Sequence, residues 1–208
     1  MPPVTVRAMD DPAARPDRRS RRRTGHTEQE LPGGGTEAQA KEVCLRLLTD
    51  RARSRAELAA KLAQKGFAAD VADRALDRLV EVGLIDDADF AQQWARSRHL
   101  HAGKGKRAIA LELRRKGIDA ADAAAALDEI DSEDERARAV DLVRKKLRTQ
   151  PPLPTEGDRR EIAAERDKLV RRLVGMLARR GYPQGMAFDV VREELAAFGT
   201  DARELPTD

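Results

Sequence analysis

Aromatic residues are scarce in this sequence: one tryptophan, one tyrosine and four phenylalanines stand among 208 residues. β-Strands favour aromatic and β-branched side chains, so this shortage argues against a β-rich core. The abundant residues are alanine, leucine, arginine and glutamate, which are good helix formers. The composition therefore predicts a mostly helical protein.

Cysteine and long apolar runs are also rare. Cys44 is the only cysteine, which excludes an intramolecular disulfide and suits a reducing cytoplasm. It lies on an apolar helical stripe, so we expect a small buried side chain. No apolar run approaches the roughly 18 residues that a membrane-spanning helix needs, and the N-terminus lacks the apolar segment of a secretion signal. We expect a cytoplasmic protein without membrane contact.

The motifs of common catalytic and metal sites are absent. The sequence contains no G-x-x-x-x-G-K-[ST], no G-x-S-x-G and no H-E-x-x-H. None of the three histidines, His26, His99 and His101, has a cysteine pair near it. We expect His99 and His101 to be exposed on a basic face. The sequence predicts no enzyme activity, no cofactor and no metal.

Residues 1–37 contain almost nothing that could be buried. They hold scattered prolines, the basic run Arg18–Arg23 and the triplet Gly33–Gly35. We expect a disordered basic tail, either simply solvated or acting as a loose arm that touches nucleic-acid phosphates.

Helix start and stop signals begin after this tail. Thr36 can cap a first helix, and Ser54 with Glu57 forms a capping box for a second. Asp70 is expected to cap a third helix, which ends at Gly83. These signals predict a unit of three helices.

The same pattern recurs at fixed distances from Gly66, Gly117 and Gly181. Each glycine follows a cation, and leucine stands four residues before it each time. Agreement at this many positions predicts three copies of one module. The matching residues are Leu58, Ile109 and Leu173; Leu62, Leu113 and Leu177; Lys65, Lys116 and Arg180; Phe67, Ile118 and Tyr182; Ala72, Ala123 and Ala187; and Leu76, Leu127 and Val191.

The repeats predict an all-α protein of three tandem three-helix units in an elongated, curved arrangement. One such unit is too small to bury its apolar face alone, so neighbouring units must join. The third repeat is expected to open with a capping box at Ser132 and Glu135, and prolines near residues 149–158 predict an insertion within it. The expected boundaries are 38–85, 86–131 and 132–198, followed by a C-terminal tail at 199–208.

Charge is segregated between helices, although the net charge is only +3. The second helices of repeats two and three are basic, whereas the third helices are acidic. Cations near helix C-termini can be merely solvated, but their clustering favours a surface for an anionic partner. The candidate residues are Arg98, Lys104, Lys106, Arg107, Arg114, Arg115, Lys116, Arg171, Arg172, Arg179 and Arg180.

Several runs resemble the RecX family. They are residues 57–67 (ELAAKLAQKGF), 83–91 (GLIDDADFA) and 109–118 (IALELRRKGI), and the resemblance weakens in the third repeat. It implies a bacterial, non-catalytic regulator that binds RecA or RecA–DNA filaments. Such a protein inhibits filament growth, ATP hydrolysis and strand exchange in recombination, DNA repair and the SOS response. We expect a monomer that also has the option of touching single- or double-stranded DNA directly.

The alternative is a DNA-binding repressor or nucleoid-associated protein built from the same helices. It would need an exposed, non-acidic recognition helix, because phosphates repel an acidic one, and the sequence offers none. Trp94, on a stripe with Phe90, is expected to be a core residue rather than a platform for a base. Reversing the charges of Arg114, Arg115 and Lys116 is expected to weaken filament binding without unfolding the protein.

Overall fold

The computed structural model describes residues 34–151 and 158–204, and this part of the chain is helical without any strand. The all-α prediction is confirmed. Residues 1–33 of the predicted tail and 152–157 of the predicted insertion lie outside the described residues. The helices are α1 (Glu37–Asp50), α2 (Arg55–Gln64), α3 (Ala69–Glu81), α4 (Asp87–Leu100), α5 (Lys106–Arg115), α6 (Ala120–Asp128), α7 (Ser132–Leu147), α8 (Arg159–Arg179) and α9 (Gln184–Glu204).

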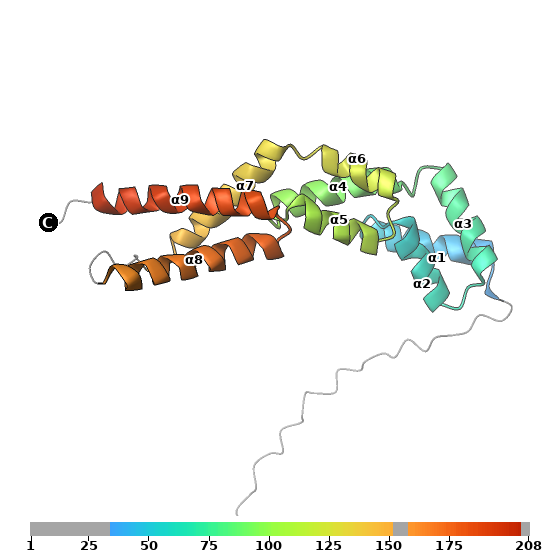
Figure 1. The fold of residues 1–208 in the computed structure, drawn as a ribbon. Helices are drawn as coiled ribbons and strands as arrows, with labels where there is room; N and C mark the ends of the chain where they lie inside the picture. Colours follow the sequence, from blue (N-terminus) through green and yellow to red (C-terminus); the bar gives the residue numbers. More distant parts are fainter. Residues whose placement is uncertain (1–33, 152–157, 205–208) are drawn as a thin grey trace, which may run out of the picture.

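These helices form three groups that follow one another along an elongated molecule (Figure 1). The groups are α1–α3, α4–α6 and α7–α9, and the extensive helix–helix packing joins helices of the same group. Each group encloses its own cluster of buried apolar side chains. The predicted row of three-helix repeats is therefore confirmed as the architecture.

The middle helix of each group supplies the centre of its core. Two apolar residues four positions apart lie on one face of α2, α5 and α8, and all six are completely buried. The residue after each anchoring glycine folds back onto the same core. The pairs are Leu58 and Leu62, Ile109 and Leu113, and Leu173 and Leu177, and the residues after the glycines are Phe67, Ile118 and Tyr182.

The caps predicted at Thr36 and Ser54 are confirmed, and both are capping boxes, although a box was predicted only for Ser54 with Glu57. The Thr36 hydroxyl accepts a hydrogen bond from the Gln39 amide, and the Gln39 side chain accepts one from the Thr36 amide. Ser54 and Glu57 make the same reciprocal pair at the start of α2. These caps satisfy amides that have no partner within the helix.

Two other predicted caps are wrong. α3 begins two residues earlier than expected, with Ala68 as its N-cap, and Asp70 pairs instead with Arg74, its carboxylate 3.0 Å from the guanidinium. α7 has no capping box, because Asp131 caps it and accepts from the Glu133 amide at 3.1 Å. Glu135, the expected partner in that box, points to another helix.

No helix within residues 34–151 and 158–204 combines the length and apolar character that crossing a membrane requires.

Candidate partner-binding surface

The three middle helices lie in a row (Figure 1). The C-termini of α5 and α8 each meet the N-terminus of the preceding middle helix, and we call these two contacts joints. At the joint between α5 and α2, the Ser54 hydroxyl donates to the Lys116 carbonyl at 2.6 Å. At the joint between α8 and α5, the Gly105 amide donates to the Arg180 carbonyl at 2.9 Å. In both cases an N-cap residue bonds a C-cap residue. The negative end of one helix dipole thus faces the positive end of the next.

The anchoring glycines allow this close approach. Gly117 has φ +73°, and a Cβ there would lie 2.3 Å from the Ala56 Cβ. Gly181 has φ +90°, and a Cβ there would lie 2.3 Å from the Ala108 nitrogen. Glycine at these positions therefore serves both the helix cap and the joint.

Each joint also receives a carboxylate from the following group. Asp87 of α4 accepts from the Arg55 amide at 2.8 Å, and Glu135 of α7 accepts from the Lys106 amide at 2.8 Å. These amides belong to the first residues of α2 and α5, where negative charge is favoured. Burial raises the pKa of the Asp87 carboxyl, against the opposing effect of the Arg55 amide. Glu135 is almost fully buried, so its carboxylate binds within the joint and not to solvent or a partner.

An ion pair crosses the joint between α2 and α5. The Lys116 ammonium lies 2.9 Å from a Glu57 carboxylate oxygen and 4.0 Å from the centre of the Trp94 ring. Partial burial alone would raise the pKa of Glu57, but hydrogen bonds from Arg51 and Lys116 outweigh it and lower the pKa to about 2. Lys116 is thus held by a carboxylate and an aromatic face.

Arg98 is likewise engaged within the molecule. Its guanidinium makes two hydrogen bonds to Glu112, at 2.6 and 2.8 Å, and lies 5.4 Å from the Trp94 ring centre. The Trp94 indole also donates to Glu112, at 3.1 Å. Trp94 stacks on Phe90 and packs against the α4–α6 core, so the core prediction is confirmed, but the residue is only partly buried.

The joint between α5 and α8 uses Arg180 and Tyr182. Arg180 donates to the Ala102 carbonyl at 2.9 Å, and the buried Tyr182 hydroxyl donates to the Gly103 carbonyl at 3.3 Å. Burial raises the pKa of Tyr182 to about 12. The expectation for His99 is wrong, because it is buried with its Nδ1 3.1 Å from the Lys104 carbonyl oxygen.

The eleven candidate cations therefore fall into two sets. Arg98, Lys116 and Arg180 are partly buried and bound to other groups of the protein, and Lys104 and Lys106 are partly buried beside the second joint. The other six are exposed on α5 and α8, and in the described part of the chain only Arg172 of these forms a side-chain hydrogen bond, to Gln150. The exposed six are Arg107, Arg114, Arg115, Arg171, Arg172 and Arg179.

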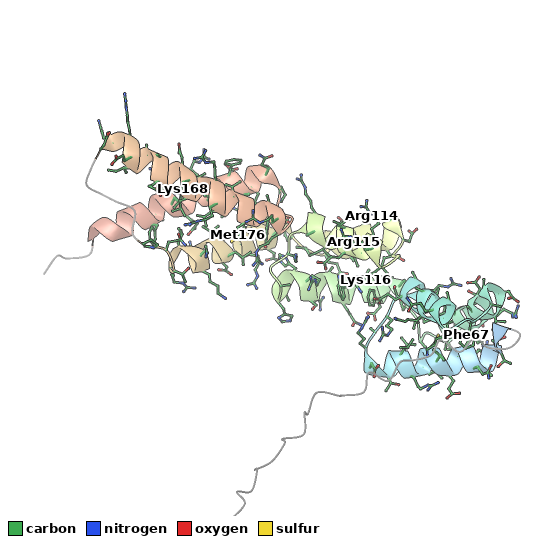
Figure 2. The ribbon with its side chains drawn as sticks, turned by 90° about the horizontal axis from the view of Figure 1, so that it is seen from below. Phe67, Arg114, Arg115, Lys116, Lys168 and Met176 are labelled. Atoms are coloured by element: carbon green, nitrogen blue, oxygen red, sulfur yellow. The ribbon has the colours of Figure 1, made fainter. Side chains whose placement is uncertain are left out.

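The exposed basic helices lie on the same side of the molecule. Figure 2, seen from below the view of Figure 1, shows α5 with Arg114 and Arg115 and α8 with Lys168. In Figure 1, α6 lies above α5 and α9 lies above α8, whereas α3 lies at the right-hand end of the molecule. Partner binding by the basic side stays a prediction.

Several acids of the third helices are neutralised within their own group. Arg55 lies 2.5 Å from Asp77 of α3, and Arg144 lies 2.7 Å from Glu194 of α9. α6 differs, because it holds Asp122 and Asp128 and contains no cation. The charge pattern in the sequence located the basic helices, but it could not reveal which charges are already paired.

No three His, Cys, Asp or Glu side chains are grouped as a metal site would require in the part of the chain that the structure describes.

Comparison with known proteins identifies the family. Residues 40–79 match the family description "RecX, first three-helix domain", and residues 86–127 match "RecX, second three-helix domain". The regulatory protein RecX of Mycolicibacterium smegmatis is 60% identical over 161 residues, covering 77% of this chain and 81% of that protein. The regulatory protein RecX of Mycobacterium avium is 55% identical over 161 residues, covering 77% and 87%.

Solved structures agree on the fold. The crystal structure of RecX from Lactobacillus salivarius superimposes with a TM-score of 0.61 at 22% identity, covering 76% of this chain and 95% of that chain. At this identity the likeness concerns the fold alone, whereas the sequence matches establish kinship. The chain belongs to the RecX family.

Proposed function

We propose that this protein is a non-catalytic regulator that binds RecA assembled on DNA and inhibits filament growth, ATP hydrolysis and strand exchange. Membership of a family of regulatory proteins supports the general role. The observation that carries the proposal is the unpaired basic side of α5 and α8 on an elongated body. The protein acts in the cytoplasm as a monomer.

The basic side of α5 has the geometry of a contact surface. Arg107 and Arg114 are seven residues apart, so they lie about 10 Å apart along one helix face. Both are exposed, and neither forms an ion pair with another described residue. Exposed guanidinium groups of this kind suit carboxylates or phosphates on a partner, because their fork of donors can bind two oxygens at once.

The joints extend this surface from one group to the next. Gly105 and Arg180 hold the start of α5 against the end of α8, so the cations of both helices are presented together. A row of small groups has a long surface for its size, which suits an extended partner. A RecA–DNA filament is such a partner.

A sequence-reading repressor is poorly supported. In a helix-turn-helix module the second helix of the motif enters the major groove. That position falls on the third helix of each group, and α6 there carries Asp122 and Asp128 without any cation. Phosphates on both sides of the groove would repel such a helix.

The test removes charge from α5 without disturbing a joint. The double variant Arg114→Gln and Arg115→Gln keeps Lys116, whose ion pair with Glu57 makes it unsuitable for charge reversal. We expect filament affinity and inhibition of RecA ATP hydrolysis to fall about tenfold, because exposed ion pairs contribute ~0.2–1 kcal/mol each.

The matched control is Arg74→Gln with Arg78→Gln, which removes the same charge from exposed positions on α3. This control should inhibit RecA like the unchanged protein. Equal inhibition by the α5 variant and the unchanged protein would remove the basis for the assignment.

A further inference from the structure

A second set of cations lies at the C-terminal end of α7, a helix that the proposed function does not use. Lys145, Lys146 and Arg148 form the C-terminal end of α7, and all three side chains are exposed. None makes a side-chain hydrogen bond or ion pair within residues 34–151 and 158–198. No described acid therefore pairs with these three cations.

The sequence of α7 explains why these charges are unpaired. Glu133, Asp134 and Glu135 all lie in its first turn, far from its basic last turn. This arrangement suits the helix dipole at both ends, but it separates the two signs of charge. The nearer acids are already paired: Asp141 lies 3.8 Å from Arg138, and Glu194 lies 2.7 Å from Arg144.

α8 adds cations beside the end of α7. Leu147 of α7 belongs to the same buried cluster as Leu169 and Leu173 of α8. Their sequence neighbours on α8, Lys168 and Arg172, are exposed. Lys168 lies 3.4 Å from Glu165 of the same helix, and the Arg172 side chain donates to Gln150 just after α7. The Arg172 bond places α8 beside the end of α7, and Figure 2 labels Lys168 on α8.

We propose that this distal cation surface binds the phosphate backbone of duplex DNA without reading its sequence. The distal cation surface consists of Lys145, Lys146, Arg148, Lys168 and Arg172.

The distal cation surface offers charge but no aromatic side chain, which favours duplex DNA over single-stranded DNA. None of the five residues is aromatic, so bases of a single strand would find no stacking platform among them. A surface that binds through charge alone binds most tightly to the nucleic acid with the highest charge density. Duplex DNA carries one negative charge per ~1.7 Å of axis and releases more counterions per contact than a single strand does.

This inference goes beyond the proposed function and does not depend on it. The cations of α5 and those at the end of α7 belong to different three-helix groups, so each set can be removed separately, although Arg172 of α8 belongs to both surfaces. A filament regulator with both surfaces would hold the filament through one and a neighbouring duplex through the other.

The experiment measures anisotropy of a labelled duplex and of its isolated labelled strand, without RecA, as salt rises from ~50 to ~200 mM. The full chain should bind the duplex more tightly than the strand, and affinity should fall steeply with salt. The variant Lys145→Gln, Lys146→Gln, Arg148→Gln and Lys168→Gln should lower the logarithmic salt slope by about 0.9 for each phosphate that the protein no longer neutralises. Arg172 is left in place because of its bond to Gln150.

The matched control removes four exposed cations from the first group: Arg46→Gln, Lys61→Gln, Arg74→Gln and Arg78→Gln. It has the same net charge as the distal variant and should retain most of the salt slope. An equal decrease in both variants would mean that net charge alone drives binding and would overturn the proposal. Tighter binding to the single strand, or displacement of the duplex by polyglutamate at matched charge, would overturn it as well.

Two further measurements keep the result interpretable. Circular dichroism melting should show that both variants remain folded, because every substituted side chain is exposed. Filament binding by the distal variant should persist through α5. Loss of duplex binding with filament binding retained supports both proposals, whereas duplex binding that survives in the distal variant contradicts only this one.

Discussion

Glu57 shows how one side chain can serve a helix and a joint at once. Its carboxylate completes the capping box of α2 with Ser54, and it also binds Arg51 and Lys116. Cap and ion pair therefore depend on the same negative charge. Protonating or removing that charge should loosen the start of α2 and the joint to α5 together.

The pH dependence of stability follows from the lowered pKa of Glu57. The pKa is about 2 in the folded protein against 4.5 for an ordinary glutamate, so its stabilisation is complete above ~4.5 and is lost as pH falls towards ~2. Glu57→Gln should lower the free energy of unfolding at neutral pH by at most about 3 kcal/mol. Urea unfolding at about pH 7 and about pH 3 checks this, since the variant should lose less stability on acidification than the unchanged protein does.

Lys116 allows the ion pair itself to be measured. A double-mutant cycle of Glu57→Gln and Lys116→Gln should give a coupling energy of about 1 kcal/mol, because the two groups touch and are mostly shielded from water. The free energy of unfolding of the four proteins gives the value. Additive single effects would mean that Lys116 and Glu57 do not interact in solution.

At the scale of helices, the glycines that follow α5 and α8 are also points of contact between groups. Gly117 lies against Ala56 at the start of α2, and Gly181 lies against Ala108 at the start of α5. Gly83 has a similar positive φ, +72°, but faces open space. Alanine at Gly83 would add backbone strain alone, whereas alanine at Gly117 would add both backbone strain and a steric clash.

Gly117→Ala should destabilise the protein more than Gly83→Ala does. Both changes place alanine at positive φ, which costs roughly 1–2 kcal/mol. Only Gly117→Ala adds a clash with the Ala56 methyl group, so we expect its loss of stability to be larger by at least about 1 kcal/mol. Thermal or urea unfolding measures both, and equal losses would argue against a tight joint.

Local features were predictable from the sequence, whereas the joints were not. The stripes of Leu58 with Leu62 and the Ser54 capping box depend on residues three or four apart, so spacing alone reveals them. The bond from Ser54 to the Lys116 carbonyl spans 62 positions, and no local pattern encodes it. Glu135 was assigned to its own helix for the same reason, although it caps the Lys106 amide of α5.

The same limit applies to the candidate binding residues. Clustering of cations on α5 and α8 was visible in the sequence and correctly located the exposed Arg107, Arg114 and Arg115. It could not separate them from Lys116 and Arg180, which the fold uses at its joints. Burial of a charge depends on neighbours that come from other parts of the chain.

At the scale of the whole molecule, the joints order the three groups so that basic helices share one side. α5 and α8 present unpaired arginines there, while many acids of α3 and α9 are bound by cations of their own groups. The net charge of +3 conceals this division. The account therefore predicts a partner that is long, anionic on its surface and contacted by more than one group.

The most direct test of the central claim compares three ligands for the unchanged protein: RecA alone, bare DNA, and RecA assembled on DNA with a nonhydrolysable nucleotide. A salt titration accompanies each, because phosphate contacts lose affinity steeply with salt. We expect the assembled filament to bind most tightly and bare duplex to bind in the weak range of ~10⁻⁴–10⁻⁶ M at physiological salt. Equal or tighter binding to bare DNA, unchanged by RecA, would contradict it and favour a DNA-binding protein instead.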